Sequence, residues 1–150
     1  MGKKRVKKET EQDILKEQET VDKKLKKEVS VKSSSKLRGG RVYISSTYNN
    51  TIISLTDERG DVIFQKSAGS IGFKGTKKGT SFAASRVADT VVEVCNKVKI
   101  KQVDVFIKGI GGGRDTALKT LANKGLDILS IHDVTPVPHN GCRPRKPRRV

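Results

Sequence analysis

Several residue types are scarce in this chain of 150 residues, and each scarcity limits what the protein can be. Two cysteines cannot make a disulfide framework and no signal peptide pattern is present, so we expect a reducing compartment. No apolar run approaches the roughly 20 residues that a membrane-spanning helix needs. Tryptophan is absent and aromatic residues make up only 4% of the chain, which predicts a modest core of aliphatic side chains.

Catalytic and metal-binding patterns are also missing. No G-x-S-x-G or H-E-x-x-H motif occurs, and no histidine precedes His132. His139 and Cys142 have a spacing that zinc ligands use, but the second close pair that a zinc site needs is absent from the sequence. Cys95 falls on the apolar stripe of a predicted helix, so we interpret it as a core residue. The sequence therefore predicts no enzyme, no metal and no cofactor.

Positive charge is what the chain has in excess. Its formal net charge is +16 and its isoelectric point is about 10.1. The last eleven residues, 140–150, hold five basic residues and no acid, which is the highest density of charge in the chain. Such a protein usually binds a polyanion, because the release of counterions favours the complex. An anionic membrane surface is the alternative, and we expect no membrane contact.

Composition divides the chain into three segments. Residues 1–40 combine Lys, Glu, Ser and Thr with few apolar residues, so they cannot offset their ordering entropy and we expect them to be largely disordered. Residues 41–138 carry the hydrophobic periodicity of a globular α/β domain. Residues 139–150 form a basic C-terminal arm.

The globular segment shows the periodicities of both strands and helices. The predicted strands are 41–47, 51–57, 61–67, 101–109 and 126–135. Apolar residues at helical spacing predict a helix that begins near Thr80, and a shorter helix follows the glycines after the fourth strand and stops at Gly125. The order β-β-β-α-β-α-β predicts an antiparallel meander followed by parallel pairing of the later strands. We therefore expect an α/β fold, a mixed five-stranded sheet with two helices and extended basic termini.

Two glycine-rich segments are candidate binding loops. In "SAGSIGFKGTKKGTS" the glycines allow close approach and the lysines neutralise phosphate, while Phe73 either stacks on a base or, more commonly for a single aromatic residue, fills the core. The segment shows no periodicity, so we expect a loop. "GIGGGRD" is either a tight turn that needs positive φ or a phosphate-binding turn to which Arg114 adds charge.

The closing segment "HNGCRPRKPRRV" favours a structured polyanion site. Arginine outnumbers lysine in it, and a guanidinium offers phosphate a planar, bidentate fork. Pro144 and Pro147 stiffen the arm toward an extended shape, so less entropy is lost when it docks. We expect the arm to dock on a polyanion and to order only when it binds. Asn140 and Gly141 either make a turn or form isoaspartate.

Three stretches together resemble a known family. They are "STYNNTIISLTDERGDVIFQKSAGSIGFKGTKKGTSFAA", "KGIGGGRD" and "DVTPVPHNGCRPRKPRRV", and they are similar to the bacterial-type small-subunit ribosomal proteins of the S-eleven family, from about Arg41 to Val150. The resemblance implies a ribonuclease-H-like fold, and we expect no nuclease activity because the first strand has no carboxylate before Asp57. Residues 1–40 are longer and more acidic than the usual family N-terminus, and "GIGGG" replaces a turn that more often contains prolines.

The resemblance also implies a place and partners. It implies a structural role in the small subunit of a cytoplasmic, bacterial-type ribosome, with an organellar ribosome as the less favoured case. The implied partners are platform rRNA near its 3′ end, the S-six/S-eighteen pair and S-seven, close to the exit path of the messenger. Scarce aromatic residues fit shape-based rRNA recognition better than a sheet with stacked rings. The alternative is a free-standing basic RNA-binding or chaperone protein.

The family's RNA-facing parts are the Asn-rich hairpin tip, the Gly/Lys loop, the Gly-rich turn and the basic tail. Carried onto this chain, and extended to the nearby basic side chains Lys66 and Arg86, the resemblance implies a set of rRNA-binding residues. They are Asn49, Asn50, Lys66, Gly72, Phe73, Lys74, Gly75, Lys77, Lys78, Arg86, Gly112, Gly113, Arg114, His139, Asn140, Gly141, Arg143, Arg145, Lys146, Arg148 and Arg149.

Overall fold

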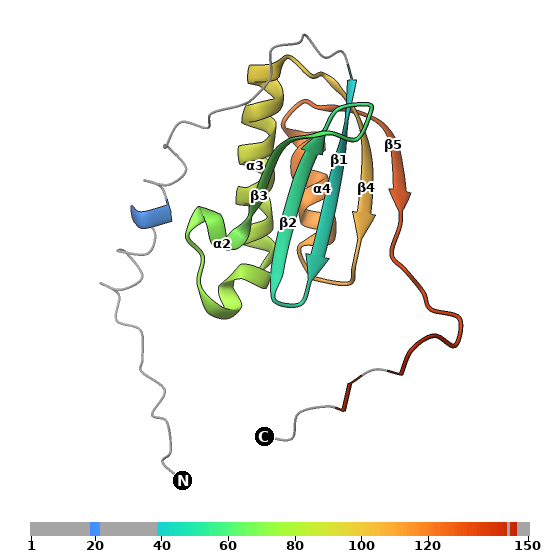
Figure 1. Cartoon of the computed structure of the whole chain (residues 1–150). Helices are drawn as coiled ribbons and strands as arrows, with labels where there is room; N and C mark the ends of the chain where they lie inside the picture. Colours follow the sequence, from blue (N-terminus) through green and yellow to red (C-terminus); the bar gives the residue numbers. More distant parts are fainter. Residues whose placement is uncertain (1–18, 22–38, 144, 147–150) are drawn as a thin grey trace.

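The computed structural model describes residues 19–21, 39–143 and 145–146 (Figure 1). Five strands and two long helices make up most of it. The elements are β1 (Gly39–Thr47), β2 (Asn50–Thr56), β3 (Val62–Ser67), α2 (Ala68–Ile71), the 3-10 helix η1 (Gly75–Gly79), α3 (Ser81–Val98), β4 (Gln102–Lys108), α4 (Arg114–Asn123) and β5 (Asp127–Asp133). None of the helices in this described part is long and apolar enough to cross a membrane.

The strands form one sheet in the order β3-β2-β1-β4-β5. β1 pairs antiparallel with β2, and β2 pairs antiparallel with β3, which is the predicted meander. β4 lies parallel to both β1 and β5. The reason is that α3 returns the chain to the starting end of the sheet before β4, and α4 does so before β5. The predicted mixed five-stranded sheet is therefore confirmed.

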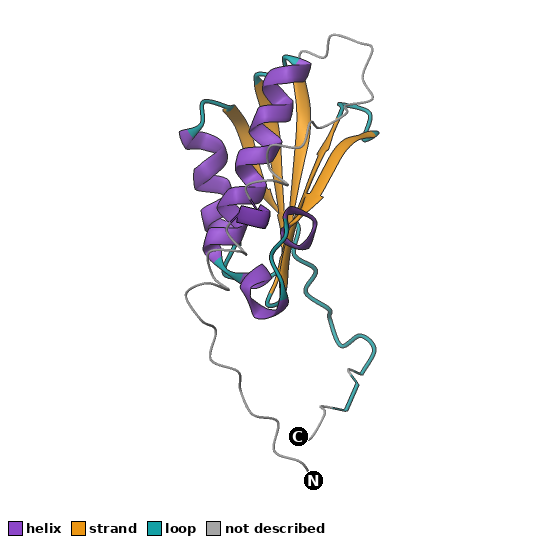
Figure 2. Cartoon of the chain, turned by 90° about the vertical axis from the view of Figure 1, so that its left-hand side faces the viewer, coloured by secondary structure: helices purple, strands orange, loops and turns teal. Residues whose placement is uncertain are grey.

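Both long helices cover the same face of the sheet (Figure 2). Strand residues alternate between this face and the other, so that Val42 and Ile44 of β1 are fully buried while Tyr43 between them is half-buried. α3 lies against β2 and β3, and α4 lies against β1 and β4. Cys95 of α3 is buried in this core as predicted, and burial raises the pKa of its thiol to about 12.

The helix ends lie where the sequence predicts them. Thr80 is the N-cap of α3, and its hydroxyl oxygen accepts a hydrogen bond from the Ala83 N–H at 3.2 Å. α4 ends at Asn123, and Gly125 follows with a φ of 86°, a conformation that favours glycine. Both ends are local features, which is why the sequence reveals them.

The Gly/Lys loop is more regular than predicted. It contains the one-turn helix α2 and the 3-10 helix η1, so the expectation of two helices misses two short ones. In α2, Ser67 and Ser70 cap each other: the Ser70 N–H donates to the Ser67 hydroxyl, and the Ser67 N–H donates to the Ser70 hydroxyl. A single turn is too short to show a hydrophobic period, which explains why it was missed.

The predictions for the N-terminal extension fall mostly on residues 1–18 and 22–38, which lie outside the described residues. Residues 19–21 are helical, and the Val21 side chain is buried.

Candidate nucleic-acid interface

Four of the predicted binding segments meet at one end of the sheet, which we call the loop end. β1, β4 and β5 run in the same direction, so their carboxyl ends share this end. The β1–β2 hairpin tip, the α2–η1 segment, the turn before α4 and the start of the C-terminal arm all lie at the bottom of Figure 1. Segments that are far apart in sequence, such as the hairpin tip at Asn49 and the chain at Thr135 after β5, therefore belong to the same end of the molecule.

Close backbone packing holds these segments together. The Ser81 hydroxyl, at the start of α3, donates to the Gly112 carbonyl at 3.1 Å. The Gly111 N–H donates to the Ser46 carbonyl of β1 at 3.1 Å. A Cβ added to Gly79 would lie 2.2 Å from the Tyr48 carbonyl oxygen, so η1 lies directly on the hairpin tip. The loop end is therefore a packed surface on which each segment supports the next.

The glycines of the turn before α4 serve mainly this packing. A Cβ at Gly109 would lie 2.1 Å from the Ser46 carbonyl oxygen, and the φ of Gly109 is 100°. At Gly111 it would lie 2.3 Å from the Thr47 carbonyl oxygen, and at Gly113 2.5 Å from the Thr51 hydroxyl. Gly112 alone of the run 111–113 is exposed, and nothing lies within 4 Å of its added Cβ. The interpretation as a turn that needs positive φ fits Gly109, whereas Gly111 and Gly113 are required by close packing.

The loop end carries an excess of positive side chains. Those among the described residues are Lys66, Lys74, Lys77, Lys78, Arg86, Lys108 and Arg114, and the acids beside them are Asp115 and Asp133. Lys74 and Lys108 are exposed, and Lys108 is a cation that the sequence prediction missed. The opposite end of the sheet mixes both signs, with Asp57, Glu58, Asp61 and Asp127 among Arg59, Lys97, Lys99, Lys101 and Lys124. Charge therefore favours a polyanion at the loop end.

Two aromatic side chains are exposed at this end, and neither is Phe73. Phe73 packs against the core and meets Phe82 edge-on, with 6.0 Å between the ring centroids. Phe82 is 59% exposed and Tyr48, at the hairpin tip, is 75% exposed. The Arg86 guanidinium lies 5.3 Å from the centroid of the Phe82 ring. The core-filling interpretation of Phe73 fits the structure, and the prediction missed Phe82 although it lies outside the apolar stripe of α3.

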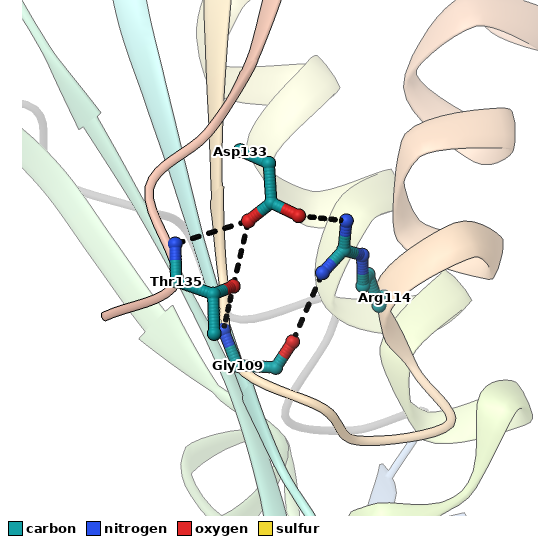
Figure 3. A network of polar contacts seen from close by, with 4 residues as sticks. All are labelled: Gly109, Arg114, Asp133 and Thr135. Carbon is teal, nitrogen blue, oxygen red and sulfur yellow. Dashed lines mark hydrogen bonds and ion pairs between the residues drawn. The ribbon is translucent and has the colours of Figure 1, made fainter. Parts of the chain in front are cut away.

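Arg114 is held by the protein itself (Figure 3). Its guanidinium donates to Asp133 Oδ2 at 2.6 Å and to the Gly109 carbonyl at 3.2 Å. Thr135 donates to Asp133 Oδ1 from its hydroxyl at 2.6 Å and from its N–H at 3.0 Å. Hydrogen bonds from the Thr135 hydroxyl, then from Arg114 and then from the Thr135 N–H, hold the pKa of Asp133 at about 2, below its ordinary value of 3.8. Arg114 therefore joins the Gly-rich turn to the start of the arm, rather than standing free for phosphate.

The C-terminal arm leaves the sheet beyond this network. Every described residue from Pro136 to Lys146 is exposed, and no described residue after Asp133 belongs to a helix or strand. Asn140 has a φ of 53°, which fits the turn interpretation of Asn140-Gly141. Arg148 and Arg149, with Pro144 and Pro147, lie outside the described residues. Among the residues that are described, no group of three metal-ligating side chains occurs.

The other face of the sheet holds a row of stacked rings that composition did not predict. Tyr43, Phe106 and His132 lie on β1, β4 and β5, with ring centroids 5.0 and 5.1 Å apart and nearly parallel planes. This spacing is close to the distance of about 4.8 Å between strands, so the rings cover one another's faces. The faces that these rings turn toward each other are therefore not available for stacking on RNA bases.

An Asp–Ser–His group on the same face has no catalytic geometry. Ser130 donates to Asp104 Oδ1 at 2.5 Å, and His132 Nε2 lies 3.1 Å from the Ser130 hydroxyl oxygen. A serine nucleophile needs a histidine base that accepts its proton and is itself held by the carboxylate. Here the serine lies between the other two and its proton is directed to the carboxylate.

Comparison with known proteins gives a consistent result. The family model described as "Ribosomal protein S11" matches residues 40–149. The chain is 52% identical over 119 residues to "Small ribosomal subunit protein uS11c" of Cyanidioschyzon merolae, covering 79% of this chain and 98% of that protein. It is 50% identical over 128 residues to "Small ribosomal subunit protein uS11" of Nautilia profundicola, covering 83% and 98%.

Proposed function

The chain belongs to the ribosomal protein S11 family, and from this premise we propose that it is a structural constituent of the small ribosomal subunit that binds rRNA with its loop end and its C-terminal arm. The observation that carries the proposal is the convergence of the hairpin tip, the Gly/Lys segment and the start of the arm at one basic end of the sheet. No catalytic step belongs to this function.

Recognition of this kind depends on shape and charge. A-form RNA has a deep, narrow major groove, so proteins contact its backbone and its unpaired bases. The loop end supplies lysines for the backbone, and Tyr48 and Phe82 supply exposed rings for unpaired bases. Arg114 and the Gly-rich turn contribute by fixing where the arm begins.

The finer placement follows from the family resemblance. We propose that the rRNA site is on the platform near the 3′ end and the exit path of the messenger, beside the S-six/S-eighteen pair and S-seven. We further propose a bacterial-type ribosome in the cytoplasm, a globular unit over residues 41–138 and an arm over 139–150. The function of residues 1–40 does not transfer from the family.

The arm supplies the test. A variant with Arg143, Arg145, Lys146, Arg148 and Arg149 changed to Gln keeps the length and the prolines of the arm. Its affinity for platform rRNA fragments is measured across a salt series beside the unchanged chain. Each phosphate contact contributes about 0.7 to 0.9 to the slope of log affinity against log salt concentration. Because the variant loses several such contacts, we expect its slope to be shallower than that of the unchanged chain by several times this amount.

A matched control removes charge at the opposite end of the sheet. Lys97→Gln with Lys101→Gln changes two exposed lysines there and is expected to leave the slope nearly unchanged. Equal slopes for the arm variant and the unchanged chain would contradict the proposal. Co-sedimentation with small subunits in high salt tests the alternative, because a free-standing RNA chaperone would wash off.

A further inference from the structure

β5 is an edge strand with one side unpaired in the described part of the chain. It hydrogen-bonds to β4 alone there, and nothing in the sheet order follows it. Large apolar side chains along this strand and its continuation are exposed: Leu129 by 64%, Ile131 by 55%, Val134 by 46% and Val137 by 74%. An unpaired edge with exposed aliphatic side chains is a template for another strand.

The exposure follows from how the helices lie. α4 packs on β1 and β4 and does not extend over the outer side of β5, so Ile131 is uncovered although its partner Val105 is fully buried. The opposite edge differs, because α2 and α3 both pack against β3 and its one large exposed aliphatic side chain is Val62. Helices therefore cover the β3 edge of the sheet, whereas the outer side of the β5 edge is left uncovered.

Charge argues against RNA as the occupant of this edge. β4 and β5 carry Asp104, Asp127 and Asp133 against Lys108, and the nearby Arg114 is already bound to Asp133. The two strands themselves therefore carry more acids than bases, in a chain whose net charge is +16. A phosphate backbone needs cations along its path, and this edge offers aliphatic side chains and carboxylates instead.

The acids also argue against a second copy of the chain. If two β5 strands paired antiparallel about Ser130, Asp127 of each would lie directly opposite Asp133 of the other. Like charges at directly opposite positions destabilise a strand pair. A symmetric pairing of this edge in that register, which aligns the full length of both strands, is therefore disfavoured.

We propose that the β5 edge docks an extended segment of a neighbouring protein of the small subunit, which adds a sixth strand to the sheet. The segment has apolar side chains at alternate positions, which cover Leu129 and Ile131, and a Lys or Arg that faces Asp127. Backbone hydrogen bonds supply affinity in this mode, and the alternate side chains supply specificity. The inference rests on the proposed function for the identity of the assembly, but it assigns a protein contact to a surface that the rRNA-binding loop end does not use.

Photo-crosslinking in assembled small subunits tests this contact. The full chain carries a benzoylphenylalanine at position 129, with the same group at position 62 on the opposite edge as a control. We expect position 129, and not position 62, to crosslink to one defined peptide of another subunit protein. A crosslink from position 129 to rRNA, to a second copy, to another part of this chain, or to nothing would overturn the inference.

A charge variant separates this inference from the proposed function. Leu129→Lys with Ile131→Lys places charge on exposed positions, and Val62→Lys is the matched control. We expect the double variant to compete for entry into small subunits at least about tenfold less well than the unchanged chain, a factor that corresponds to about 1.4 kcal/mol. Its thermal unfolding and its affinity for rRNA fragments should match those of Val62→Lys.

The outcomes of the two tests are distinct. Normal rRNA binding with unimpaired entry of the double variant would overturn the docking inference and leave the proposed function intact. Failure of the unchanged chain to bind rRNA or to enter the subunit would overturn both.

Discussion

Replacing Gly111 by alanine should destabilise the fold, whereas the same change at the adjacent Gly112 should not. The Gly111 Cβ would lie 2.3 Å from the Thr47 carbonyl oxygen and 2.5 Å from the Ser46 hydroxyl. A backbone carbonyl cannot rotate away as a side chain can, so the turn and the hairpin must separate. Overpacking of this kind costs about 1 to 3 kcal/mol. For a domain of about this size, that lowers the melting temperature by roughly 4 to 12 °C.

The control is unusually close in sequence. Gly112 is exposed, does not have a positive φ and would meet nothing within 4 Å of its Cβ. Alanine there restricts the unfolded chain, so we expect a melting temperature that is unchanged or slightly raised. Thermal unfolding followed by circular dichroism compares the two variants, and rRNA-fragment binding is measured below both transitions.

Two results would refute the reasoning. Equal destabilisation by both substitutions would mean that the turn does not pack on the hairpin as described. A Gly111→Ala protein with unchanged stability and lost rRNA binding would mean that this glycine serves phosphate approach rather than packing.

Three further predictions concern single side chains. Above about pH 4, the melting temperature of Asp133→Asn should be lower than that of the unchanged chain, and the difference should vanish as pH falls toward 2. The reason is that the pKa of Asp133 is depressed to about 2 in the folded protein, so its ion pair with Arg114 is lost on protonation. A difference that does not depend on pH would contradict this. Phe82→Leu should weaken rRNA-fragment binding by about 1 to 3 kcal/mol if its ring stacks on a base, with little change in melting temperature, and unchanged affinity would exclude stacking. At neutral pH an alkylating reagent should modify the exposed Cys142 in the folded protein and Cys95 only on unfolding, because burial raises the pKa of the Cys95 thiol to about 12. Equal alkylation rates of the two cysteines, measured by mass spectrometry, would contradict the buried position of Cys95.

Local signals explain most of what the sequence predicts correctly. The Thr80 cap and the Gly125 stop each depend on a few neighbouring residues, and the strand boundaries follow from runs of β-branched residues between turns. The helix α2 was missed because one turn shows no period. The structure places Phe73 in the core and Phe82 outside it, a choice that depends on how η1 and α3 pack together.

Long-range contacts explain the rest. Arg114 and Asp133 are 19 residues apart, and no spacing rule joins the first residue of a helix to the end of the following strand. The packing of three glycines on the β1–β2 hairpin likewise depends on segments more than 60 residues apart, as for Ser46 and Gly109. The open edge of β5 depends on where α4 lies on the sheet. The predicted rRNA-binding residues remain a prediction, and the structure adds Tyr48, Phe82 and Lys108 to them.

Ultraviolet crosslinking of intact small subunits tests the central claim most directly. Peptides of this chain that carry crosslinked nucleotides are identified by mass spectrometry, which gives the RNA-facing surface without any substitution. The account predicts that they come from the hairpin tip, residues 72–82, residues 110–114 and the arm over 139–150. Crosslinks concentrated at the opposite end, in residues 57–61 and 97–101, with none from the loop end, would contradict it.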